Sequence, residues 1–230
     1  DFSLFTFHSS LFTQENSHCA SRITGWKNKQ KPTTYQHPHS MKLYEKIIDH
    51  YYKEPKLKEI LTIHSRKVAE KALEICRKHP ELGLNPDDVE NAAMLHDIGI
   101  VRCDATGIEC FGKEPYLCHG RIGAGMLRQD AELFGLSKAE IEPFARVCER
   151  HTGAGLTKED IIDQDLPLPA QDFLPETTLE KVICYADKFF SKTHPDREKP
   201  LEKVLKNLKR FGDDNVVRFM EWHRLFDAEQ

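Results

Sequence analysis

The sequence has no long hydrophobic run and no large excess of one charge. Its 230 residues are 39% hydrophobic and 30% charged. No stretch approaches the roughly 20 consecutive apolar residues that a membrane-spanning helix needs, so we expect no membrane partner. The 33 basic and 37 acidic residues give a formal net charge of −4. Because this charge provides no overall basic field, we expect no extended nucleic acid as a partner.

The seven cysteines lack the spacing of a zinc or redox motif, since no two of them are separated by two residues. An odd number of isolated thiols is typical of a reducing compartment, which favours the cytoplasm. Cys103, Cys110 and Cys118 fall in one expected loop. Their wide spacing favours packing as reduced thiols over a soft-metal site.

Residues 1–40 lack a sustained apolar period. They carry four of the twelve histidines and are rich in Ser, Thr, Asn and Gln. A helical pattern begins at Met41, and we predict that the natural protein starts there. Residues 1–40 would then be a non-native, upstream-derived segment or a poorly ordered tail. The alternative is a docking arm that carries aromatic side chains to a partner.

From Met41 onward the sequence lacks strand-period runs and has the pattern of helices. Apolar residues recur every three or four positions in successive segments. Asn85 before a proline predicts a helix start, and Ser137 and Thr177, each with Glu three residues later, predict capping boxes. The predicted fold is therefore all-α, with one helical domain over residues 41–230.

Six metal-capable side chains fall on the apolar faces or at the ends of the expected helices: His64, His96, Asp97, His119, His151 and Asp187. Singly, such a histidine is more often a hydrogen-bonded core residue, as we expect for His223. Together, four imidazoles and two carboxylates would be costly to bury. Divalent metal ions remove that cost, because they bind neutral imidazole and carboxylate. Salt bridges to Lys188, Arg102 or Arg121 are the alternative.

The order His, His-Asp, His, His, Asp and the run Leu-His-Asp-Ile-Gly at 95–99 resemble the HD-domain metal-dependent phosphohydrolase superfamily, in its HDIG branch. The resemblance covers about residues 44–194. It implies a single-domain helical bundle of the HD-domain type around a metal site. The expected C-terminal helices, at 200–228, lie outside this core match and are interpreted as packing or oligomer elements.

Carried over position by position, the resemblance implies that a first ion is held by four residues: His64, His96, Asp97 and Asp187. His119 and His151 match the additional pair of two-metal members, in which Asp97 would bridge the ions. The expected cofactors are thus two divalent transition-metal ions, namely Fe, Mn, Ni or Zn.

The activity implied by the resemblance is hydrolysis of a phosphate ester of a small nucleotide or related metabolite. The attacking group would be a hydroxide that bridges the two ions, with Asp97 as the catalytic residue that positions them. Arg121 and Lys188 are candidates for binding the phosphate, and a homo-oligomer is left open.

Two other functions compete with this interpretation. Some HD-type proteins use the same ligand set with two irons as oxygenases, and the residue types alone do not separate the two chemistries. A metal-stabilised binding module without turnover is the third reading, which the complete ligand set disfavours.

Overall fold

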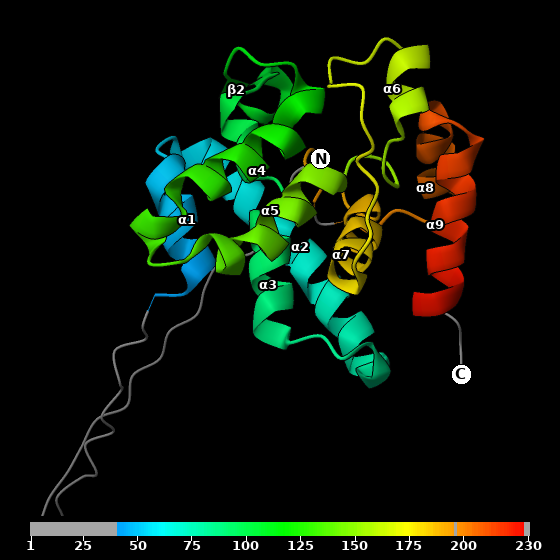
Figure 1. Cartoon of the computed structure of the whole chain (residues 1–230), viewed down its shortest axis with the longest axis horizontal. Helices are drawn as coiled ribbons and strands as arrows, with labels where there is room; N and C mark the ends of the chain where they lie inside the picture. Colours follow the sequence, from blue (N-terminus) through cyan, green and yellow to red (C-terminus); the bar gives the residue numbers. More distant parts are fainter. Residues whose placement is uncertain (1–40, 196, 228–230) are drawn as a thin grey trace, which may run out of the picture. The chain divides into compact units, whose positions relative to one another are not determined.

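Nine α-helices contain most of the described residues, which are 41–195 and 197–227 of the computed structural model (Figure 1). The helices are α1 (Leu43–Tyr51), α2 (Pro55–Lys78), α3 (Pro86–Leu95), α4 (His119–Asp130), α5 (Lys138–Arg150), α6 (Lys158–Asp163), α7 (Thr178–Lys188), α8 (Leu201–Leu208) and α9 (Asp213–Phe226). The short 3-10 helices are η1 (Pro80–Leu82), η2 (Ile98–Arg102), η3 (Thr106–Ile108), η4 (Tyr116–Cys118), η5 (Ala131–Phe134) and η6 (Lys209–Phe211). The all-α prediction is confirmed, whereas the predictions for residues 1–40 lie outside the described residues.

The helix starts follow from the local chemistry that the sequence indicated. The side chain of Asn85 accepts a hydrogen bond from the Asp87 amide, and Ser137 forms both halves of its capping box with Glu140. Thr177 also caps its helix, but the carboxylate of Glu180 accepts a hydrogen bond from the Glu176 amide instead. A capped start therefore defines α3, α5 and α7, which lead to the predicted site.

The connection between η2 and η4 contains a hairpin that the sequence did not predict. Strand β1 (Asp104–Ala105) pairs antiparallel with β2 (Cys110–Phe111). Strands of two residues are too short to produce an alternating pattern, so periodicity gave no signal for them. The hairpin is local and leaves the all-α class unchanged.

The helices pack around α7, which contacts α2, α3, α5 and α9, while α4 packs against α5 and against η2 (Figure 1). Gly99 permits the close approach of η2 to α4, because a Cβ there would lie 2.1 Å from the carbonyl oxygen of His119 and 2.4 Å from the amide of Gly123. The Gly that follows His96-Asp97-Ile98 is thus needed to place the start of α4 beside Asp97.

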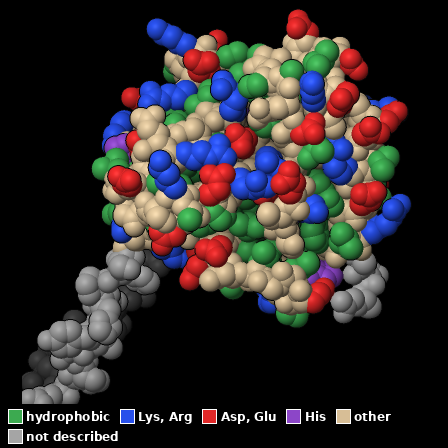
Figure 2. Space-filling view, in the orientation of Figure 1, with side chains coloured by type: hydrophobic (Ala, Val, Ile, Leu, Met, Phe, Trp, Pro, Cys, Tyr) green, Lys and Arg blue, Asp and Glu red, His purple; other side chains and the backbone are tan. Residues whose placement is uncertain are grey.

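The last two helices form a layer against α7 (Figure 1). Tyr185 of α7 stacks on Phe219 of α9 with ring centroids 4.9 Å apart, and its hydroxyl lies 2.8 Å from His223 Nδ1. His223 is therefore hydrogen-bonded against the core, as expected. The face drawn in Figure 2 mixes acidic and basic side chains. No helix within residues 41–195 and 197–227 is long and apolar enough to cross a membrane.

Candidate metal centre

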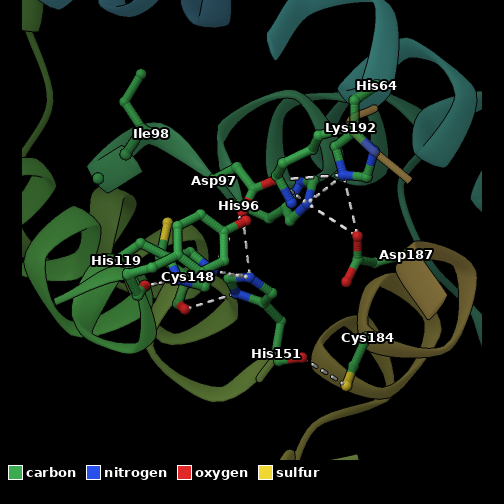
Figure 3. A network of polar contacts seen from close by, with 12 residues as sticks. His64, His96, Asp97, Ile98, His119, Cys148, His151, Cys184, Asp187 and Lys192 are labelled. Carbon is green, nitrogen blue, oxygen red and sulfur yellow. Dashed lines mark hydrogen bonds and ion pairs between the residues drawn. The ribbon is translucent and has the colours of Figure 1, made fainter. Parts of the chain in front are cut away.

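Five segments of the bundle bring the six predicted ligands together (Figure 3). His64 lies in the middle of α2, and His96 and Asp97 occupy the junction between α3 and η2. His119 begins α4, while His151 directly follows α5 and Asp187 lies in the last turn of α7. No residue of the six is more than 8% exposed. Side chains of this polarity at this depth need a strong electrostatic partner.

The first of two ligand clusters consists of His64, His96, Asp97 and Asp187, whose ligand atoms all lie within 4.8 Å of one another. His64 Nε2 is 3.0 Å from Asp187 Oδ1 and 3.2 Å from Asp97 Oδ2. His96 Nε2 is 3.1 Å from the same oxygen of Asp97. Two imidazoles and two carboxylates therefore converge on one point.

The second ligand cluster consists of Asp97, His119 and His151. It uses the other carboxylate oxygen of Asp97, since Oδ1 lies 3.2 Å from His119 Nε2 and 3.4 Å from His151 Nε2. Asp97 thus presents one oxygen to each cluster. This is the arrangement of a carboxylate that bridges two sites.

Backbone carbonyls orient three of the four imidazoles. His96 Nδ1 lies 2.6 Å from the carbonyl of Ala93, and the equivalent atoms of His119 and His151 lie 2.6 and 2.7 Å from the carbonyls of Tyr116 and Cys148. Because a carbonyl oxygen only accepts, each Nδ1 carries a proton, and each Nε2 faces the centre, where a metal ion would take the place of any second proton. His64 Nδ1 has no hydrogen-bond partner.

The donor set fits divalent cations. His119 Nε2 and His151 Nε2 are 2.9 Å apart, so two lone pairs face each other across the second cluster. Burial lowers the pKa of His151 to about 4, which keeps its ring neutral and leaves the repulsion in place. Neither carboxylate oxygen of Asp97 has a partner with hydrogen-bond geometry. A cation bound to these nitrogens and oxygens satisfies all of them.

The first cluster holds positive charge favourably. Burial alone would lower the pKa of His96, but the carboxylates of Asp97 and Asp187 outweigh burial and raise it to about 9. Burial also opposes ionisation of Asp97 and Asp187, yet His96 and the nearby ammonium groups hold the pKa of both carboxyls well below its usual range. Both carboxylates are therefore charged at neutral pH and available to a metal.

Two lysines extend from the end of α7 to the carboxylates. Lys188 Nζ lies 2.6 Å from Asp187 Oδ2 and donates to the carbonyl of His151 at 2.7 Å. Lys192 Nζ lies 2.6 Å from Asp97 Oδ2, the oxygen that faces the first cluster (Figure 3). The salt bridge to Lys188 that competed with the metal interpretation is thus formed, and Lys192 adds a second. Both ammonium groups contact carboxylates, and the imidazole nitrogens still converge on one another.

A cavity of about 840 Å³ opens beside the centre and is lined by His119, His151, Asp187, Lys188 and Lys192, among others. Lys188 therefore reaches the cavity beside the centre, and its role in binding phosphate stays a prediction. Arg121, the other candidate, is exposed on α4, and the described residues that line this cavity do not include it. Its role in substrate binding stays a prediction without support from this cavity.

Sequence reasoning missed Lys192 and Tyr116. Lys192 follows the last turn of α7, and the only sequence feature that could have placed it near the site was its spacing of four residues from Lys188. Tyr116 stacks on the imidazole of His119 with centroids 4.8 Å apart, and burial raises the pKa of its hydroxyl to about 12. It begins η4, a 3-10 helix before α4 that is too short for periodicity to mark which side chains turn inward.

Comparison with known proteins agrees with this geometry. A family model described as HD domain matches residues 61–191, the segment that carries all six ligands. An uncharacterized protein of Methanocaldococcus jannaschii is 34% identical over 155 residues, which are 66% of this chain and 78% of that protein. No solved structure matches the chain significantly.

Two further relatives are each named tRNA (cytidine(56)-2'-O)-methyltransferase. The protein of Thermoplasma volcanium is 29% identical over 172 residues, which are 74% of this chain and 43% of that protein. The protein of Picrophilus torridus is 36% identical over 103 residues, 45% of this chain and 24% of that protein. This chain thus spans less than half the length of either methyltransferase.

Proposed function

The chain belongs to the HD-domain family, whose members are mostly metal-dependent phosphohydrolases, and on that premise we propose that it hydrolyses a phosphate ester of a small nucleotide or related metabolite. The observation that carries the proposal is the bridging position of Asp97, with one oxygen in each ligand cluster. Two divalent ions held there would lower the pKa of a shared water and neutralise charge on the phosphoryl oxygens. Fe, Mn, Ni and Zn all suit this donor set.

The chain's own residues contribute position and charge. Asp97 sets the distance between the two clusters, and the carbonyl-bound rings of His96, His119 and His151 have fixed directions, so a reacting group meets a prearranged site. Lys188 and Lys192 line the cavity at the centre and offer ammonium groups to phosphate oxygens. We therefore assign the end of the cavity nearest Asp97 to the scissile phosphate.

The methyltransferase activity named for two relatives is not carried over to this chain. The matched segment is a minority of each of those proteins, and the buried histidine and aspartate clusters of this chain are suited to metal ions. The names do justify one addition to a substrate panel, a 5'-phosphorylated RNA oligonucleotide. Hydrolysis of that substrate in preference to nucleotides would contradict the proposed substrate size.

The test is metal analysis combined with phosphate release on the same samples, purified with and without oxygen. We expect about two divalent ions per chain and release of inorganic phosphate that chelation abolishes. Bound iron with oxygen uptake and no phosphate release would instead favour the di-iron oxygenase. Bound metal with neither reaction over the whole panel would favour a binding module.

A further inference from the structure

The cavity beside the metal centre is rich in cations although the chain as a whole is acidic. The lysine and arginine side chains that line it include Lys188, Lys192, Lys199, Lys203 and Arg210. The described carboxylates that line it are those of Asp187 and Glu198, and the latter already pairs with Lys71 at 2.6 Å. A concave surface with this charge attracts anions.

The cations fall into two groups that differ in their contacts with acidic side chains. Lys188 and Lys192 lie at the metal centre, in contact with Asp187 and Asp97. The others belong to the segment that leads into α8, to α8 itself and to η6. Lys203 lies in α8 and Arg210 in η6, the 3-10 helix that follows it. The cavity wall thus carries cations both beside the metal centre and along α8 and η6.

The cations of the second group lack the acidic partners that other surface cations have. Among the described residues, no carboxylate lies within 4.0 Å of Lys203 or Arg210. Elsewhere Arg128 binds both Glu142 and Glu149 through its guanidinium, at 2.8 to 3.1 Å. The α8 face therefore has positive charge that the described part of the chain does not neutralise.

Crowding of the ammonium groups is visible in Lys199, whose Nζ donates to the carbonyl of Lys188 at 2.7 Å. Burial, together with the positive charges of Lys188, Lys192 and Lys203, lowers the pKa of Lys199 to about 8, although Asp187 opposes the shift. Like charges held this close repel one another. An anion bound between them relieves the repulsion.

Resting on the proposed phosphohydrolase function, we propose that Lys199, Lys203 and Arg210 bind a second phosphate group of the substrate. The substrate is then a small molecule phosphorylated at two positions, with one phosphate at the metal centre and the other against α8. The cavity volume of about 840 Å³ falls within the range of small-molecule sites, and its lining also includes apolar side chains such as Phe190 and Phe211 for the organic part between the phosphates.

The test compares adenosine 5'-monophosphate with adenosine 3',5'-bisphosphate on the full chain. We expect KM for phosphate release to be about tenfold lower for the bisphosphate, the value of one charge-assisted hydrogen bond. The variant K203A/R210A should lose that difference while its kcat on the monophosphate is unchanged. Lys206→Ala, which removes an exposed lysine of the same helix outside the cavity lining, is the matched control and should keep the difference.

Calorimetric titration of both nucleotides into the same variants separates this inference from the proposed function. Tighter binding of the bisphosphate that K203A/R210A abolishes supports the α8 site. This holds even if neither nucleotide is hydrolysed, because the absence of hydrolysis contradicts only the proposed phosphohydrolase activity. Equal affinity for the two nucleotides, or a bisphosphate preference retained in the double variant, overturns the inference. Far-UV circular dichroism of the double variant verifies that these exposed substitutions leave the fold intact.

Discussion

The two ligand clusters share Asp97 but differ in charge. The first contains Asp187 as a second carboxylate, whereas the second contains Asp97 and two imidazoles. The same residue type consequently behaves in opposite ways, since the pKa of His96 is raised to about 9 and that of His151 is lowered to about 4. Burial opposes the charged form of both rings, but Asp97 and Asp187 outweigh it at His96, whereas repulsion from His119 and His96 adds to it at His151. Because the first cluster has the additional carboxylate, we expect the first ion to bind more tightly than the second.

The clusters also differ in how the fold holds them. The first includes one ligand from a helix interior, His64 in the middle of α2, which packs directly on α7. The second takes His119 from the first residue of α4 and His151 from the residue after α5. Helix ends are less restrained than helix interiors, so the second cluster depends more on neighbouring segments.

Removing the shared residue should have the largest effect. Asp97→Ala is expected to lose both ions and to lower kcat by roughly 1,000-fold or more, because metal ions contribute several kcal/mol to the transition state. Elemental analysis and phosphate release measure the two losses. A variant that kept one full equivalent of metal would show that Asp97 does not serve both clusters.

His119→Ala is expected to separate the clusters. It removes a ligand of the second cluster only, so the metal content should fall from about two ions to about one ion per chain. Retention of two full equivalents would contradict the dinuclear assignment. His64→Ala is the matched comparison, because it removes one imidazole from the first cluster and should instead weaken the more tightly bound ion.

Gly99→Ala tests the packing that brings His119 to Asp97. The added Cβ would lie 2.1 Å from the carbonyl oxygen of His119, so the start of α4 must shift at a cost of about 1–3 kcal/mol in the free energy of unfolding. The second ion should be lost before the first. Gly125→Ala within α4 is the control, since its Cβ meets nothing within 4 Å and the change should stabilise the chain by about 1 kcal/mol.

Substitution of Asn215 in α9 is expected to have a smaller effect on metal binding. Its buried Asn215 accepts a hydrogen bond from the Ala154 amide at 2.7 Å and so holds the loop that follows His151. Asn215→Ala should lower the free energy of unfolding by about 1–3 kcal/mol, measured by urea unfolding. It should weaken binding of the second ion but not of the first. Equal weakening of both ions would indicate a general loss of stability.

The smallest effect is expected from His223→Ala. This change removes the 2.8 Å contact with the Tyr185 hydroxyl, and we expect a loss of about 1 kcal/mol in stability with no change in metal content. His223 belongs to neither cluster, although it lies in a helix with an apolar face, as several of the ligands do. Loss of metal in this variant would place α9 closer to the site than its hydrogen bonds indicate.

Much of the fold could be predicted from the sequence, as could the six metal-capable side chains that the structure brings together. Caps such as Asn85 and Ser137 act through neighbouring residues, so they predicted helix starts that the structure confirms. The ordered histidines and aspartates predicted HD-domain membership, which the family match confirms. The hairpin at β1 and β2 was missed because two-residue strands have no period to detect.

Residue type and spacing along the chain determined the all-α class, the six metal-capable side chains and the family. The tertiary structure alone decided that each oxygen of Asp97 faces a different pair of imidazoles, that Lys192 reaches the centre, and that α8 completes the cavity. The physical reason is the range of the interactions. Helix caps and apolar periodicity depend on residues within a few positions, whereas these contacts join segments far apart in the chain and depend on how the helices pack.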